Sequence, residues 1–275
     1  MQGPRLLAVL AHPDDESLGL GGTLAKYAVQ GTNVFLLTAT RGESGRYRGF
    51  RRGDPEHPGP AELARIREAE LRAAASTLGV REVTLLDYRD SLLDEARPWE
   101  AVTAIAKHIR RVRPHVVLTF GPDGAYGHPD HIAISQFTTA AIVAAAHSAV
   151  PAEGAQSLPP HAVAKLYYIA WPESAWKAYQ AVFRKLVVHV DGVERQAVPW
   201  PKWAITTEID TRSWWPTVWR AISCHESQIT AYEQLKHLSA DDHEALWGQQ
   251  SFYRVFSTVN GGRGRETDLL EGISA

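Results

Sequence analysis

The feature that most constrains the fold is an alternation of short apolar runs with helix-forming segments in the first half of the chain. The apolar runs have the length and composition of buried strands, and the intervening segments have helical spacing. The predicted strands are residues 6–10, 33–40, 83–86 and 115–120, and the predicted helices are residues 23–30, 61–78, 98–112 and 131–146. Such crossover helices join parallel strands, so the sequence predicts an α/β fold in which a mostly parallel sheet lies between helices.

The second half of the chain differs in composition, because it contains most of the nine tryptophans. Its predicted strands are residues 165–171, 185–190 and 204–209, and its predicted helices are residues 212–234 and 241–249. We expect residues 1–150 to form the core and residues 151–259 to form a smaller C-terminal α+β annex that completes the same domain. Residues 260–275, rich in Gly, Arg and Glu, are expected to be a disordered tail.

Overall charge excludes several classes of partner. The 275 residues include 29 Lys and Arg against 31 Asp and Glu, a net charge of −2, so no basic field exists to hold nucleic acid.

No apolar run approaches the roughly 20 residues of a membrane span. The N-terminus lacks a signal-peptide pattern, so we expect a cytoplasmic protein. A homo-oligomer is left open.

Cysteine and histidine usage limits the metal chemistry that the chain can perform. A single cysteine, Cys224, can form neither an internal disulfide nor a Cys-rich zinc site. Histidine is frequent, with 12 residues, and several lie beside aspartates. Any transition-metal site must therefore use imidazole and carboxylate ligands.

Two His/Asp clusters follow predicted strands. One comprises His12, Asp14 and Asp15, and the other comprises His128, Asp130 and His131. Functional groups gather at the carboxyl ends of parallel strands, so the clusters can converge. A catalytic zinc site has three His/carboxylate ligands and a fourth position open to water. His12, Asp15 and His131 would supply the three ligands. Asp14 and His128 are then spare groups for proton transfer, and Asp130 could orient His128. Surface hydrogen bonds, or capping of the following helix by His128 and Asp130, are the simpler alternative.

The same segments resemble a known family. Residues 11–16 (Ala-His-Pro-Asp-Asp-Glu) and 128–131 (His-Pro-Asp-His) resemble the two signature motifs of the PIG-L/LmbE-like zinc de-N-acetylases. Further similar segments are residues 40–43, 65–68, 89–91 and 225–228. The resemblance implies a Rossmann-like, metal-binding catalytic core and hydrolysis of the N-acetyl group of a glucosamine-containing small molecule. It implies a Zn²⁺ cofactor, with Fe²⁺ or another divalent metal left open.

The resemblance also implies roles for individual residues. His12, Asp15 and His131 would be the metal ligands, and Asp14 the general base. His128 would stabilise the oxyanion or protonate the amine, and Tyr126 would be a mobile tyrosine that polarises the amide carbonyl. Arg65 and Asp90 would hold sugar hydroxyls, and the alternative for Arg65 is a solvated charge on a helix. Glu43 would bind sugar or brace its loop, and we expect structural roles for His225 and Gln228.

A loop of residues 45–53 departs from the better-known members of the family because it carries four arginines. It could select an anionic aglycone, which Arg binds bidentately, or it could be a solvated loop. The tryptophans are expected to pack in the core or an interface more than on sugar.

Other functions remain as alternatives. An amidase for a larger acyl or thiol-conjugate amide would use the same site, and a non-catalytic carbohydrate-binding protein would give Asp14 no purpose. Gly19, Gly21 and Gly22 predict a turn that suggests a dinucleotide-binding oxidoreductase, but Leu24 replaces the third glycine of that fingerprint. A serine hydrolase is disfavoured because no Gly-x-Ser-x-Gly motif occurs.

Overall fold

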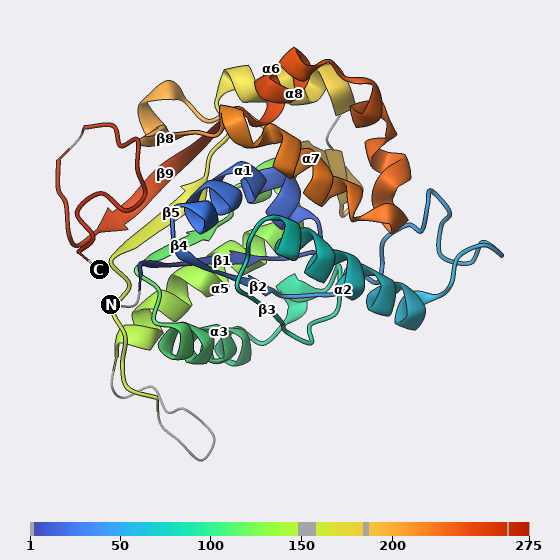
Figure 1. Ribbon diagram of the computed structural model, residues 1–275. Helices are drawn as coiled ribbons and strands as arrows, with labels where there is room; N and C mark the ends of the chain where they lie inside the picture. The colour runs from blue at the N-terminus through green and yellow to red at the C-terminus, as the bar shows by residue number, and fades with distance from the viewer. Residues whose placement is uncertain (1–2, 148–157, 184–186, 263, 275) are drawn as a thin grey trace.

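A computed structural model describes residues 3–147, 158–183, 187–262 and 264–274. Its main feature is a seven-stranded sheet with strand order β3-β2-β1-β4-β5-β9-β8 (Figure 1). The parallel strands are β1 (Arg5–Leu10), β2 (Asn33–Thr38), β3 (Glu82–Leu85), β4 (Val116–Thr119) and β5 (Lys165–Ile169). Antiparallel β9 (Gln249–Ser257) and β8 (Thr207–Asp210) extend the sheet beyond β5. The predicted α/β class with a mostly parallel sheet is confirmed.

Helices cover both faces of the sheet (Figure 1). One face carries α1 (Asp15–Val29), α2 (Pro60–Thr77) and α7 (Trp215–Ser223), and the other carries α3 (Pro98–Val112) and α5 (Pro129–Ala146). The remaining elements are α4 (Gly124–Gly127), α6 (Glu173–Phe183), α8 (Ala240–Trp247), the hairpin of β6 (Val187–Val190) and β7 (Val193–Gln196), and the 3₁₀ segments η1 (Leu93–Glu95), η2 (Lys202–Ala204), η3 (Arg212–Trp214) and η4 (Glu226–His237). Within the described ranges, no helix has both the length and the apolar character needed to cross a bilayer.

Strand β1 occupies the centre of the core because both its faces are covered. Residues 6–10 are completely buried, and Ala8 pairs with Leu36 of β2 on one side and Leu118 of β4 on the other. The chain leaves β1 towards β2 but returns to place β4 on the opposite side. The strand order therefore reverses between β1 and β4, and in open α/β sheets ligands bind at the carboxyl ends of the strands that flank such a reversal.

The predicted glycine turn is wrong, because Gly19, Gly21 and Gly22 lie inside helix α1. Their lack of a side chain permits close packing of the helix. A Cβ on Gly22 would lie 2.7 Å from Cβ of Thr211, and one on Gly21 would lie 3.2 Å from Val218 of α7. These glycines serve helix packing and not a phosphate-binding turn, which removes the sequence basis for a dinucleotide-binding function.

The second half differs from prediction in its local elements. The single helix expected at residues 212–234 is divided into η3, α7 and η4, with a break at Cys224–His225. Strand β9 and helix α6 were not predicted, and the predicted strand at 185–190 is described only from residue 187 as β6. Because β5, β9 and β8 belong to the same sheet as β1, the second half adds to that sheet. The boundaries 1–150 and 151–259 stay a prediction.

The described part of the C-terminal tail is ordered, contrary to the expectation for residues 260–275. Glu266 is buried and its carboxylate accepts hydrogen bonds from Lys165 (2.8 Å) and Tyr167 (2.8 Å) of β5. Leu269 is fully buried, and its backbone N–H donates to Tyr27 of α1. The composition of the tail is typical of disorder, but the burial of Leu269 and the buried ion pair of Glu266 hold these residues against the sheet and α1.

Candidate active site

The turn between β1 and α1 presents the first cluster of functional side chains. The carboxylate of Asp15, in the first turn of α1, accepts hydrogen bonds from the backbone N–H groups of His12 (2.8 Å) and Ala11 (3.2 Å). Asp14 precedes the helix with φ 104°, a left-handed conformation that is costly for a residue other than glycine. This tight turn directs His12, Asp14 and Asp15 to the end of the central strand.

The connection between β4 and α5 presents the second cluster. His128 is the N-cap of α5, where its Nδ1 accepts a hydrogen bond from the backbone N–H of Asp130 (3.2 Å), and Pro129 occupies the first turn. His131 is also in that first turn and stacks on Phe120, with ring centroids 3.9 Å apart and planes 8° apart. The capping role considered as an alternative for His128 therefore exists alongside its position in the site.

Three potential metal ligands converge between these turns. The nitrogen and oxygen atoms that His12, Asp15 and His131 offer all lie within 4.8 Å of one another, and all three residues are buried. His12 Nδ1 lies 3.1 Å from His131 Nε2, which in turn lies 3.4 Å from a carboxylate oxygen of Asp15. Two imidazole nitrogens and one carboxylate oxygen form a donor set that suits a catalytic zinc ion or Fe²⁺.

Two further carboxylates fix the ring of His12. Its Nε2 lies 3.0 Å from Asp130 and 3.2 Å from Asp90. Burial alone would lower the pKa of His12, but the hydrogen bonds to Asp130 and Asp90 raise it to about 10. The Nε2 proton therefore points at these carboxylates, which leaves Nδ1 facing His131 and Asp15. Such carboxylate–histidine pairs orient metal-binding imidazoles in other proteins.

The carboxylate of Asp130 therefore orients His12, whereas His128 was the expected partner of Asp130. Its two carboxylate oxygens also accept hydrogen bonds from the backbone of Ser91 (2.8 Å) and Leu93 (3.1 Å). Asp130 does contact His128, but through its backbone N–H and not through its carboxylate. A second possible metal group, His12, His128 and Asp130, is less suitable because these same contacts occupy its ligand atoms.

The protonation of His128 follows from its cap contact. A backbone N–H can only donate, so Nδ1 is unprotonated and the neutral ring carries its proton on Nε2. Burial lowers the pKa of His128 to about 4, with a further contribution from the charges of His12 and His131. Tyr126 lies edge-on to His128 and His131, and burial raises the pKa of its hydroxyl. Both side chains are consequently hydrogen-bond donors at neutral pH.

These groups line a cavity of about 490 Å³, a volume in the usual range for small-molecule sites. Most of the polar lining comes from the first half of the chain, and an apolar wall is formed by Leu18 together with the stacked pair Trp171 and Tyr179, whose ring centroids are 4.6 Å apart. Among the sequence-predicted site residues, those that line the cavity are His12, Asp14, Asp15, Asp90, Tyr126, His128 and His131.

The arginine in this cavity is Arg67, whereas Arg65 was predicted. Arg65 is exposed on α2, forms an ion pair with Glu62 and does not line the cavity. Arg67 is buried, and its guanidinium donates to the carboxylate of Asp14 (3.1 Å) and to the carbonyl oxygen of Gly42 (2.8 Å). Two residues along a helix are separated by about 200°, so the two arginines point to opposite sides.

Hydrogen bonds join the loops that follow β2 and β3 beside the cavity. Asp90 is buried and accepts a hydrogen bond from the backbone N–H of Ser44 (2.9 Å). Glu43 accepts one from the backbone N–H of Asp90 (3.0 Å) and does not line the catalytic cavity. Of the two roles considered for Glu43, its position favours bracing of the loop.

Residues late in the chain hold the β1–α1 turn and the arginine-rich loop. His225 is fully buried and bonds to the carboxylate of Glu16 (2.8 Å), which also accepts from the backbone N–H of Asp14 (3.0 Å). Gln228 lines the cavity and donates to the carbonyl oxygen of Arg46 (2.7 Å). No local sequence pattern predicts the pairing of His225 with Glu16, because the two residues are 209 positions apart.

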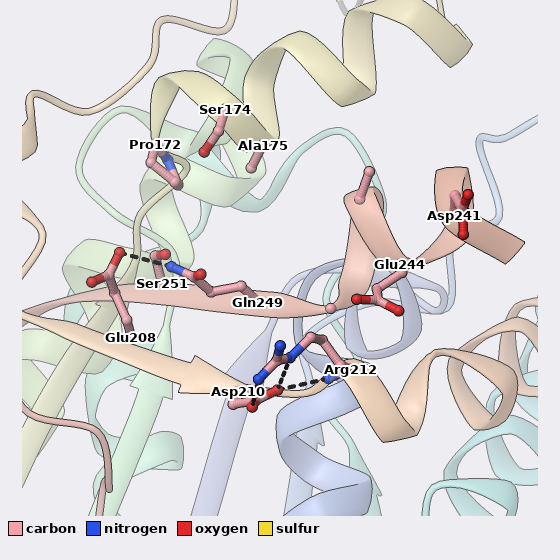
Figure 2. A pocket seen from close by; sticks show the side chains of 12 residues that line it. Pro172, Ser174, Ala175, Glu208, Asp210, Arg212, Asp241, Glu244, Gln249 and Ser251 are labelled. Carbon is pink, nitrogen blue, oxygen red and sulfur yellow. Dashed lines mark hydrogen bonds and ion pairs between the residues drawn. The ribbon is translucent and has the colours of Figure 1, made fainter.

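A larger cavity of about 690 Å³ lies elsewhere, between α6, α8 and strands β8 and β9 (Figure 2). Its charged lining residues are four acidic side chains and one arginine, and Figure 2 shows Asp210 paired with Arg212 and Glu208 bonded to Gln249. It contains no histidine and none of the convergent ligands. The smaller cavity is therefore the candidate active site.

A cavity at the carboxyl ends of parallel strands, lined by convergent potential metal ligands and titratable side chains, is the arrangement of an enzyme active site on an α/β sheet. Residues 7–142 match the family described as GlcNAc-PI de-N-acetylase, PIG-L. The 1D-myo-inositol 2-acetamido-2-deoxy-alpha-D-glucopyranoside deacetylase of Kineococcus radiotolerans is 36% identical over 313 residues, covering 99% of this chain and 84% of the relative. The deacetylase of the same description from Rhodococcus opacus is 36% identical over 298 residues, covering 99% of each chain. The chain belongs to the PIG-L family, and the predicted family and deacetylase class are confirmed.

Solved structures agree on the fold. The N,N'-diacetylchitobiose deacetylase of Pyrococcus horikoshii is similar with a TM-score of 0.66 at 20% identity, covering 91% of this chain and 83% of that one. The 4-carboxy-2-hydroxymuconate hydratase GalB of Pseudomonas putida is similar with a TM-score of 0.65 at 20% identity, covering 94% and 99%. Since the second protein is a hydratase, these likenesses describe the scaffold, and the reaction has to be argued from the site and the sequence relatives.

Proposed function

We propose that this protein removes the acetyl group from an N-acetylglucosaminide by metal-dependent hydrolysis of the amide bond. The observation that carries the proposal is the convergence of His12, Asp15 and His131 next to Asp14 and His128 in one cavity. Relatives described as deacetylases of an N-acetylglucosaminyl inositol are 36% identical to nearly the whole chain. We therefore propose a glucosaminide with an inositol-like polar aglycone as the substrate class.

His12 Nδ1, His131 Nε2 and the carboxylate of Asp15 would hold the metal, with Zn²⁺ favoured by the donor set and Fe²⁺ compatible with it. When bound in such a site, a divalent ion lowers the pKa of a coordinated water and polarises a carbonyl. The carboxylates of Asp130 and Asp90 hold His12 in the tautomer that this ligand set requires.

Proton transfers would be carried by the remaining side chains of the cavity. The carboxylate of Asp14, which lies 3.1 Å from the guanidinium of Arg67, would accept a proton from the attacking water. The Nε2–H of His128 and the hydroxyl of Tyr126 would donate to the amide oxygen as it gains negative charge. The proton taken up by Asp14 would then pass to the amide nitrogen as the C–N bond breaks, which releases the amine and acetate.

Substrate contacts would come from Asp90 and the apolar wall. Asp90 can accept a hydrogen bond from a sugar hydroxyl, and Trp171 offers an aromatic surface for the sugar ring. We do not retain Arg65 in this role, because its side chain lies outside the cavity. A related amidase for larger acyl groups would use the same catalytic groups and remains the alternative.

Measurement of acetate release tests the proposed deacetylase against the alternative, an amidase for larger acyl groups. The protein should carry close to one Zn²⁺ or Fe²⁺ per chain, measured by elemental analysis, and should release acetate from N-acetylglucosaminyl inositol. A chelator should abolish release, and added Zn²⁺ should restore it. Full activity in metal-free protein would contradict the mechanism, and faster hydrolysis of a longer N-acyl chain would favour the amidase.

A further inference from the structure

A second hollow adjoins the catalytic cavity and has no role in the reaction described above. It has a volume of about 400 Å³ and lies between the loop after β2, the start of α2 and the segment after β3. The charged side chains in its lining are Arg41, Glu43, Arg52, Asp87 and Arg89. Ser44 lines both this hollow and the catalytic cavity, so a molecule bound at the catalytic groups can extend past Ser44 into it.

Some charged side chains of this hollow already bond to protein groups, and others do not. The guanidinium of Arg41 pairs with Glu68 (2.9 Å) and Asp87 (2.7 Å), and the carboxylate of Glu43 accepts the Asp90 backbone N–H. The side chains of Arg52 and Arg89 are exposed and form no hydrogen bond or ion pair with any residue that the structure describes. Two uncommitted guanidinium groups therefore face a hollow next to the catalytic groups.

The arginine-rich loop of residues 45–53 contributes to this hollow through one member. In Figure 1 the segment between β2 and α2 extends outward beside α2. Arg46 donates to the carbonyl oxygen of Gly49, and Arg48 lies 3.6 Å from Glu226. Arg51 is exposed but does not line the hollow, whereas Arg52 does. Arg89 reaches it from a different segment, so the two arginines approach from separate loops.

We infer that this hollow is an aglycone subsite for an oxyanion, a phosphate or carboxylate carried by the group attached to the glucosamine ring. The inference rests on the proposed function, which puts the N-acetyl group at His12, Asp15 and His131. Guanidinium groups bind phosphate and carboxylate bidentately, and among the described residues no ion pair of Arg52 or Arg89 would have to break first. A neutral aglycone would fit the same space without using either charge.

Three glucosaminides that differ only in aglycone charge test the inference. They carry a neutral polyol, the same polyol with one phosphate monoester, and a dicarboxylic acid. We expect Arg52→Gln together with Arg89→Gln to lower kcat/KM for a charged substrate by roughly tenfold or more, mainly by raising KM. The neutral substrate should be little affected, and the preference for charge should weaken as salt is added. Arg51→Gln is the matched control from the same exposed loop.

The outcomes separate this inference from the proposed function. Loss confined to the phosphate or to the dicarboxylate substrate supports the subsite and identifies its oxyanion. An equal loss on neutral and charged substrates, or an effect of Arg51→Gln equal to that of the double substitution, overturns the subsite while deacetylation stands. If wild-type protein releases acetate from none of the three, the proposed function fails and the subsite fails with it.

Discussion

Asp14 shows how much of the surrounding structure serves one side chain. Its backbone adopts a left-handed conformation, which persists only where neighbouring contacts require it. Glu16 holds its N–H, His225 holds Glu16, and Arg67 contacts its carboxylate. Each contact comes from a different segment, so the orientation of this carboxylate depends on α1, α2 and the start of η4 together.

Replacing Asp14 should separate proton transfer from metal binding. Asn has nearly the same shape and tolerates positive φ, so Asp14→Asn should fold and keep its metal while kcat falls by about 10²- to 10⁴-fold through loss of the base. His131→Ala should lose both metal and activity because it removes a proposed ligand. Metal content and acetate release would be measured on the same samples. Normal turnover in Asp14→Asn would rule out its role as base.

At the residue scale, the sequence predicts which residues converge but not every contact between them. His12, Asp15 and His131 follow strands whose ends must meet, so their proximity could be inferred. The partner of Asp130 could not, because the choice between His12 and His128 depends on side-chain directions in two turns. The exchange of Arg65 for Arg67 has the same origin, since the angular position of a helix is fixed by its packing and not by its motif.

Helix α1 shows the same limit for a whole element. Its glycines have a local preference for turns, which packing against Thr211 and α7 overrides. The break at Cys224–His225 is a second case, because the pairing of His225 with Glu16 lies outside any local sequence pattern. Strand β9 depends on β5 and β8 as neighbours. The long helices α3 and α5 were predictable because their own sequences favour helix.

Alanine at two positions of α1 should distinguish close packing from helix preference. At Gly22 a Cβ would lie 2.7 Å from the Cβ of buried Thr211, so Gly22→Ala should destabilise the protein by about 1–3 kcal/mol through overpacking. At Gly19 the nearest atom is 3.6 Å away, and Gly19→Ala should be neutral or stabilising by up to about 1 kcal/mol because alanine favours helix. Denaturant unfolding would measure both, and equal stabilities would refute the packing argument.

On the scale of the whole molecule, the C-terminal tail ties the two halves of the chain together. Glu266 bonds to Lys165 of β5 and to Thr207 of β8, and Asp268 accepts a hydrogen bond from Tyr27 of α1. A sheet that begins with residues of the first half therefore depends on the last residues for the burial of Lys165, which is fully buried. Glu266 and Leu269 of the tail are consequently part of the buried core.

Stability at low pH should report the charge of Glu266. Burial alone would raise its pKa, but hydrogen bonds from Asn260 and Lys165 outweigh burial and lower it to about 2. The stabilisation is present above the ordinary pKa of a glutamate and is lost as the pH falls through the lowered value. Glu266→Gln should cost up to about 3–5 kcal/mol at pH 7, since it leaves Lys165 without its carboxylate.

Thermal unfolding from pH 7 down to pH 2 would follow this effect. The difference in Tm between wild type and Glu266→Gln should be large at neutral pH and should shrink as the pH falls below the ordinary range for a carboxyl group. Glu271→Gln, an exposed change in the same tail, is the control and should leave Tm unaltered at every pH. A Tm difference that stays constant across this range would argue against the charged form.

The reversal of strand order between β1 and β4 has a consequence for biosynthesis. His12 leaves the ribosome 119 residues ahead of His131, and β4 must pair beside β1 before the two imidazoles can meet. Until then only His12 and Asp15 of the proposed ligand set are close together, and two ligands would bind a metal ion weakly. We therefore expect the proposed metal site to be completed only after the first half of the chain has been translated.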